Sequence, residues 1–232
     1  MNYIGNKKYL KSNDVHFYIG WALIAIGSIF FLMGEFLWIY IVPYQFFVSI
    51  ICLIFGAIVE FVPKAGCTSE EDIDRAVKDK TDKLCEKVTA IVGKSILKQG
   101  ERPAVIGNYL LDRTDVIVRK GRKDQKIRSS VYSSAVIAFK KESIYIHQNT
   151  FSLISDEETE TATDIPYANC PKAVIEEREA VLSDKAKTRI KVRELHITDN
   201  SNLQLKICVV NSMLIDEICE KLNAQVKNVN KK

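Results

Sequence analysis

The sequence contains none of the short motifs that mark phosphate loops, dinucleotide sites, nucleophile elbows or zinc proteases. No GxxxxGK[ST], GxGxxG, GxSxG or HExxH string occurs in its 232 residues. The histidines are few and isolated, since none of His16, His147 and His196 has a Glu or His four positions later. The six cysteines show no CxxC spacing, so we interpret them as thiols. We therefore predict no enzyme, no catalytic residue, no metal and no cofactor.

Charge is almost absent from residues 17–62. This segment holds 36 apolar residues out of 46, and its only charged residues are Glu35 and Glu60. A helix needs roughly 20 apolar residues to cross a bilayer core about 30 Å thick. Two stretches, residues 17–38 and 44–62, meet that length, and Pro43 lies between them. The pattern predicts a transmembrane helical hairpin.

The lysines that flank the hairpin indicate its orientation. Lys7, Lys8 and Lys11 precede the first stretch, Lys64 follows the second, and the connection has no Lys or Arg. The positive-inside rule then puts both termini in the cytoplasm, with residues 1–16 as a cytoplasmic N-terminal segment. We predict a multi-pass protein of the inner (cytoplasmic) membrane. A cleaved signal peptide is not expected, because sixteen residues precede an apolar run that is too long.

Small residues recur along the hairpin and predict close helix packing. They are Gly20, Gly27 and Gly34 in the first stretch and Ser49 and Gly56 in the second. The favoured interpretation is that the two helices pack on each other through these residues. The alternative is that the same residues mediate homo-oligomerisation.

The composition changes after Pro63, where charged residues become frequent. Thr68 and Ser69 stand ahead of Glu71 and Asp72, as in a capping box at the start of a helix. Apolar residues then recur at helical spacing among Lys, Asp and Glu. We predict an amphipathic connector helix within residues 63–100 that stands off the membrane.

Residues 101–232 change from helical to alternating periodicity, which predicts strands. The expected strands are residues 104–111, 115–119, 131–140, 143–154, 160–165, 173–182, 188–198 and 203–210. The segment after Asn211 and Ser212 has one apolar face at helical spacing. The fold class we predict is α+β, with a small antiparallel β-barrel closed by a C-terminal helix.

The strand series, the FKKESIYIHQNTFSLI hairpin and the terminal helix together resemble a pleckstrin-homology (PH)-like domain of bacterial membrane proteins. The resemblance covers about residues 103–226. It implies a binding domain for lipid or protein, since this superfold hosts many ligands. PH domains that bind phosphoinositides carry a basic loop between their first two strands. The matching stretch here, called the basic loop, is residues 119–128, and its basic residues are Arg119, Lys120, Arg122, Lys123, Lys126 and Arg128.

The basic loop has a net charge of +5, because Asp124 is its only acid. It predicts binding of anionic lipid headgroups or a protein partner, although a solvated turn explains the pattern equally well. An acidic stretch, residues 155–164, is interpreted as a solvated hairpin tip, or as a segment that pairs with a neighbouring protomer. Nucleic acid is not predicted as a partner, because no aromatic residue interleaves with the basic run.

Three functional hypotheses follow. The first is a membrane-anchored binding or scaffold protein. The second is a two-transmembrane effector, in which a cytoplasmic β-domain senses a soluble signal such as a cyclic nucleotide and clusters the hairpins to disrupt the membrane. The third is an accessory subunit of a larger membrane complex.

Overall fold

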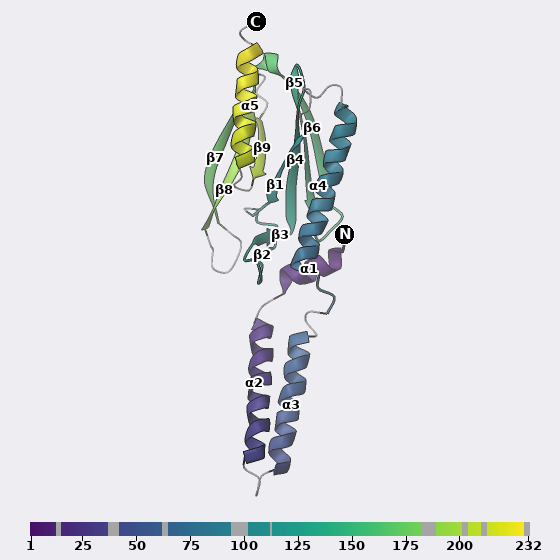
Figure 1. The fold of residues 1–232 in the computed structure, drawn as a ribbon, viewed down its shortest axis with the longest axis vertical. Coiled ribbons are helices and arrows are strands. Elements are labelled where there is room, and N and C mark those ends of the chain that lie inside the picture. Colours follow the sequence, from purple (N-terminus) through teal and green to yellow (C-terminus); the bar gives the residue numbers. More distant parts are fainter. Residues whose placement is uncertain are drawn as a thin grey trace. The chain divides into compact units, whose positions relative to one another are not determined.

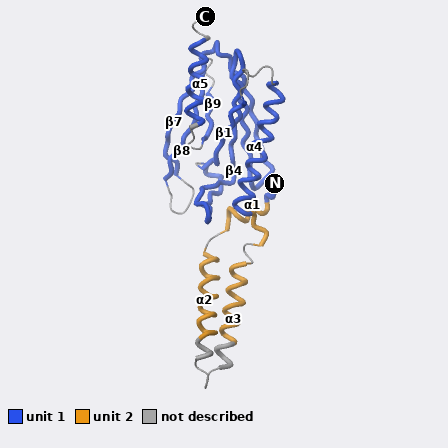
Figure 2. Tube along the Cα trace, viewed as in Figure 1, with its two compact units in different colours: residues 1–3, 69–232 blue, residues 4–68 orange. Residues whose placement is uncertain are grey.

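A computed structural model describes residues 1–12, 15–36, 42–61, 65–93, 102–111, 113–181, 189–200, 204–209 and 213–229. The chain divides into two compact units (Figure 2). The apolar unit comprises residues 4–68, and the β-rich unit comprises residues 69–232 together with residues 1–3. The apolar helices and the strands therefore belong to different units.

The apolar unit contains α1 (Tyr3–Lys11), α2 (Val15–Phe36) and α3 (Val42–Phe61), seen in Figure 1. Helix α1 was not predicted. One described helix is long and apolar enough to span a membrane, and its apolar part is Val15–Leu32. The apolar part of α3 that the structure describes, Phe47–Phe61, is shorter. Large apolar side chains such as Trp21 (53% exposed) and Phe47 (65% exposed) cover the outer surface of this helix pair.

Helices α2 and α3 meet through small residues. A Cβ added at Gly56 would lie 2.9 Å from the Gly20 carbonyl oxygen, and one added at Gly27 would lie 3.1 Å from the Ser49 carbonyl oxygen. The Ser49 hydroxyl donates a 2.8 Å hydrogen bond to the Gly27 carbonyl oxygen. These four residues therefore lie at the contact within one chain. Gly34 belongs to α2, and its surroundings lie outside the described residues.

The described residues of the β-rich unit form three antiparallel sheets. The first has the order β1-β4-β5-β6, formed by Ala104–Tyr109, Val131–Phe139, Ser143–Ser152 and Glu158–Pro166. The second is the β2-β3 hairpin, Val118–Lys120 and Ile127–Ser129. The third has the order β7-β8-β9, formed by Lys172–Val181, Arg189–Thr198 and Gln204–Val209. Helix α5 (Met213–Val229) follows and contacts β7 (Figure 1).

The expected α+β class holds, but the expected closed barrel is wrong for the described part of the chain. Strands β1 and β9 lie near each other without ladder pairing, and the Asn108 side chain bonds the Val209 carbonyl oxygen at 3.4 Å. At the other seam, Pro166 ends β6 and the 3₁₀ turn Tyr167–Asn169 intervenes before β7. Proline has no N–H to continue a ladder. The strands thus form separate hydrogen-bonded sheets.

The central strand β4 is buried on both faces, and this organises the unit. Its residues Ala135, Ile137 and Phe139 belong to the main core, with side chains of the three-stranded sheet and α5. The alternate residues, Val136 and Ala138, face the other way and pack against a helix. Alternation of side chains across the sheet produces the two faces.

That helix is α4 (Glu70–Val92), which lies within the predicted connector helix of residues 63–100. Ser69 caps its start by accepting the Asp72 backbone N–H at 3.1 Å. Its residues Leu84, Val88 and Val92 are buried against β4. Helix α4 is therefore part of the β-rich unit and covers one face of the four-stranded sheet.

Candidate functional site

The basic loop folds as the β2-β3 hairpin, in which Arg119 lies opposite Arg128. The second of these strands was not predicted. The hairpin is attached to the first turns of α4, because the Arg122 backbone N–H donates to the Glu70 carboxylate at 2.7 Å. Arg119 and the side chain of Arg122 are half-buried.

Arg128 differs from the other basic residues because its side chain is only 1% exposed. Its guanidinium donates to both oxygens of Asp74 on α4, at 2.9 and 2.7 Å, and to both oxygens of Asp124, at 3.1 and 2.6 Å. Burial raises the pKa of Asp74, but the hydrogen bonds and charge of Arg128 outweigh it and leave that pKa lowered. The hydrogen bond from Arg128 lowers the pKa of Asp124 to about 2. Arg128 thus fastens the hairpin to α4.

Gly121 makes this arrangement possible. A Cβ at this position would lie 2.3 Å from Asp124 Oδ1 and 2.7 Å from Arg128 Nη1. No real side chain fits at those distances, so glycine is required where the two charged groups approach the backbone.

The lysines of the basic loop remain at the surface. Lys120 is exposed, and the side chains of Lys123 and Lys126 are 84% and 66% exposed. Lys123 lies 4.0 Å from Glu71, and Lys126 lies 3.5 Å from Asp74. Exposed pairs at such distances are weak and can exchange partners. Within the basic loop, Arg128 is therefore a buried structural residue, whereas the three lysines are at the surface.

The acidic stretch is largely strand β6 rather than a hairpin tip. Glu158 pairs with Lys80 of α4 at 2.7 Å, and Glu160 pairs with Lys87 of the same helix. The hydrogen bonds from these lysines lower the pKa of both glutamates. The acidic residues therefore help to hold α4 on the sheet.

A groove runs between α4 and β1, and we call it the α4–β1 groove. Its volume is about 680 Å³, within the range of small-molecule sites. The residues that line it are Asp74, Val77, Lys78, Thr81, Asp82, Val105, Asn108, Tyr109, Lys126, Ile127 and Tyr132. They come from α4, β1, β4 and the β2-β3 hairpin, so the groove lies wholly within the β-rich unit.

Two tyrosines form part of the groove. The rings of Tyr109 and Tyr132 meet edge to face with centroids 5.0 Å apart. Tyr132 lies across β1 at Gly107, where an added Cβ would be 2.9 Å from the tyrosine ring and hydroxyl. Burial raises the pKa of both phenols, so they stay neutral donors. Tyr109 donates to Asp74 at 3.1 Å, which ties β1 to α4.

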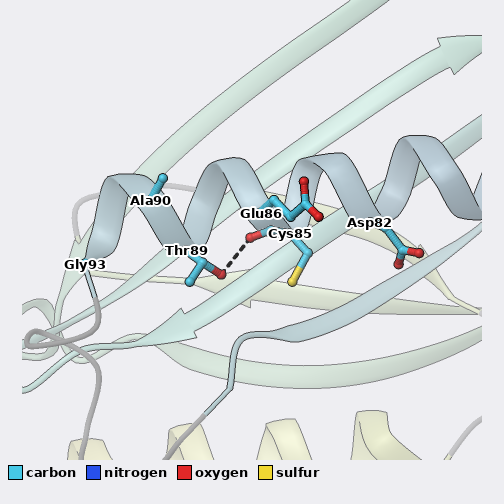
Figure 3. A pocket seen from close by; sticks show the side chains of 6 residues that line it. All are labelled: Asp82, Cys85, Glu86, Thr89, Ala90 and Gly93. Atoms are coloured by element: carbon cyan, nitrogen blue, oxygen red, sulfur yellow. Dashed lines mark hydrogen bonds between the residues drawn. The ribbon is translucent and has the colours of Figure 1, made fainter.

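A second cavity of about 710 Å³ lies along the later turns of α4 (Figure 3). Its described lining residues are Asp82, Cys85, Glu86, Thr89, Ala90 and Gly93. The Thr89 hydroxyl is turned back to the Cys85 carbonyl oxygen at 2.8 Å and is thereby committed to the helix. Asp82 lines both cavities.

Comparison of the chain with protein-family models, with curated proteins and with solved structures gave no match in any of the three.

Proposed function

We propose that this chain is a membrane-anchored binding protein whose β-rich unit contacts anionic lipid through Lys120, Lys123 and Lys126. In this proposal α2 and α3 are two membrane spans, both termini are cytoplasmic, and the β-rich unit is PH-like. The PH-like fold is supported by two antiparallel sheets of four and three strands followed by a C-terminal helix.

The two-span arrangement is supported by contacts inside the apolar unit. Helix α1 precedes α2, and residues 65–68 follow α3. The Lys8 ammonium donates to the Ala65 carbonyl oxygen at 3.2 Å, and the Thr68 backbone N–H donates to the Gly5 carbonyl oxygen at 3.2 Å. Segments on either side of the helix pair are thus joined at one end, as a hairpin that enters and leaves from one leaflet requires.

The observation that carries the proposal is the attachment of the basic loop to the start of α4 by Arg128. Glu70 comes only nine residues after Phe61, the last residue of α3. The basic loop is therefore attached to residues that follow the apolar helix closely in the sequence.

The binding free energy that the lysines contribute at an anionic membrane is modest, but it is sufficient for a tethered domain. Each lysine near an anionic leaflet contributes about 1 kcal/mol, so three contribute about 3 kcal/mol. Tethering raises the effective concentration of the membrane surface, so weak contacts are enough to orient the domain. Among the described residues, Glu71, Asp74 and Asp124 have carboxylates within 4.0 Å of the loop's basic groups, and Asp74 and Asp124 are committed to buried Arg128. Glu70 accepts the Arg122 backbone N–H instead.

Flotation of a fragment of residues 69–232 tests this proposal. The fragment must begin at Ser69, because α4 supplies Asp74. We expect it to float with phosphatidylcholine vesicles that contain phosphatidylglycerol, and not with phosphatidylcholine alone. A Lys120→Glu/Lys123→Glu variant should lose this binding, because it reverses two surface charges.

The matched control is Lys172→Glu/Lys206→Glu, which changes two exposed lysines of the three-stranded sheet by the same charge. It should float like the wild type. Equal flotation of all three proteins would contradict the lipid proposal, and it would leave a protein partner as the ligand class for the basic loop.

The effector hypothesis needs the small residues of the hairpin to be available between chains. In the structure, Gly20, Gly27, Ser49 and Gly56 lie at the contact of α2 with α3. This placement favours an anchor that is complete within one chain, and we therefore place the binding protein ahead of the effector.

A further inference from the structure

The α4–β1 groove contains more uncommitted hydrogen-bond donors than acceptors. Lys78 is exposed and makes no ion pair with any other described residue. The Tyr132 hydroxyl makes no hydrogen bond within the described part of the chain. Among the described residues, the Lys126 ammonium has only the 3.5 and 4.0 Å contacts to Asp74 and Asp124. These three groups offer O–H and N–H donors to a ligand.

The acceptors of the groove are mostly occupied. Both oxygens of Asp74 accept hydrogen bonds from Arg128, and one of them also accepts a hydrogen bond from the Tyr109 hydroxyl. The Asn108 side chain is bonded to the backbone at Tyr109 and Val209. Asp82 is exposed at the edge. A ligand that brings acceptors rather than donors is therefore the chemical complement.

The apolar residues that line the groove indicate what else the ligand must contain. Val77 is buried and Val105 is half-buried, and both line the groove together with Tyr109. A volume of about 680 Å³ admits an organic body larger than a bare inorganic ion. We propose that the α4–β1 groove binds an organic anion, with its carboxylate or phosphate at Lys78, Lys126 and the Tyr132 hydroxyl and its apolar body against Val77 and Val105.

The walls of the groove are fixed by contacts within the chain. Arg128 fixes the hairpin wall to Asp74, and Tyr109 fixes β1 to the same carboxylate. The ring of Tyr132 is held against Gly107. When the walls of a site are already held by contacts within the protein, ligand binding costs little free energy for ordering them. This site goes beyond the proposed lipid surface and has two groups, Lys78 and Tyr132, that the basic loop does not supply.

The test uses the full chain in phosphatidylcholine nanodiscs, with 2-naphthyl phosphate as the probe. Hydrogen exchange followed by mass spectrometry reports where the probe binds. We expect saturable protection of peptides that cover residues 74–82 and 104–109. The uncharged analogue 2-naphthol should protect the same peptides at least tenfold more weakly, because it lacks the oxyanion.

Lys78→Gln and Tyr132→Phe should each raise the apparent Kd about tenfold, since each removes one donor to an anion. Lys172→Gln is the matched control and should bind as the wild type does. Thermal unfolding of each variant shows that it is folded; Lys78 is exposed, and Tyr132→Phe removes only a hydroxyl group. The variants avoid Lys120 and Lys123, so failure here is distinguishable from failure of the lipid proposal.

A second arm distinguishes the source of the anion. Hexyl phosphate that binds more tightly than 2-naphthyl phosphate supports a lipid-derived ligand, and the reverse order supports a soluble aromatic one. The proposal is overturned if neither phosphate protects these peptides at millimolar concentration. It is equally overturned if 2-naphthol binds as well as the phosphate, or if Lys78→Gln and Tyr132→Phe leave the Kd unchanged.

Discussion

Arg128 and the neighbouring lysines carry the same charge but occupy different environments. The planar guanidinium satisfies two carboxylates at once, from Asp74 and Asp124, which an ammonium group cannot do with the same geometry. Arg128 can be buried because four hydrogen bonds to carboxylate oxygens compensate its charge. A run of basic letters does not reveal this difference, since it depends on Asp74, which is 54 residues away in sequence.

The first prediction concerns Asp124. Its pKa is about 2 in the folded protein, below the ordinary 3.8, so its contribution to stability is fully present above pH 3.8. That contribution is lost as the pH falls from 3.8 through about 2. Urea unfolding of residues 69–232 should therefore show a free energy of unfolding that decreases over this interval. Asp124→Asn should be less stable near neutral pH and show a weaker acid dependence.

Comparison of the two proteins isolates Asp124, because the variant keeps the other carboxyl groups whose pKa is lowered in the wild type, such as Asp74, Glu158 and Glu160. Parallel curves of stability against pH for wild type and variant would show that Asp124 does not contribute as described.

At the scale of elements, alternation predicted most strands within two or three residues, because one buried face is a local property of a strand. Strand β3 was missed, since Ile127–Ser129 has only three residues and lies in a charged run. The packing of α4 was also missed. Lys80 and Lys87 become informative only beside Glu158 and Glu160, and no local pattern reveals that pairing. The groove was not predicted from the sequence for the same reason, because the residues that line it come from segments that are far apart in the chain.

The second prediction is that α4 is required for the β-rich unit to fold stably. A fragment of residues 101–232 loses Asp74, a partner of buried Arg128, and uncovers Val136 and Ala138, which are fully buried. Leaving a buried charge short of a partner costs about 3 kcal/mol or more. The urea midpoint of this fragment should be well below that of residues 69–232. Equal midpoints would mean that α4 is only an appendage.

At the scale of the whole molecule, the chain combines an apolar helix pair with a charged β-rich unit. The average over the chain, 47% apolar residues and a net charge of +4, is representative of neither unit. The sequence shows an abrupt change of hydropathy at residue 63, and the units of the structure divide between Thr68 and Ser69. The sequence was insufficient for the sheet closure, which depends on Asn108 and Pro166 at the two seams.

The third prediction concerns topology. A protease-cleavable tag at either terminus should be protected in intact spheroplasts and cleaved in inverted membrane vesicles, because the flanking lysines favour the cytoplasmic side. A cytoplasmic marker protein serves as the control for leakage. Cleavage of one tag in intact spheroplasts would mean a single span, and cleavage of both would mean the opposite orientation.

The division of aromatic residues between the units gives the protein two built-in optical probes. Both tryptophans lie within residues 17–62, and Trp21 is on the outer surface of α2. The β-rich unit has no tryptophan, and its tyrosines include the edge-to-face pair Tyr109 and Tyr132. Tryptophan emission therefore reports on the surroundings of the apolar helices alone. In the fragment of residues 69–232, which has no tryptophan, near-ultraviolet circular dichroism reports on the tyrosines, this pair included.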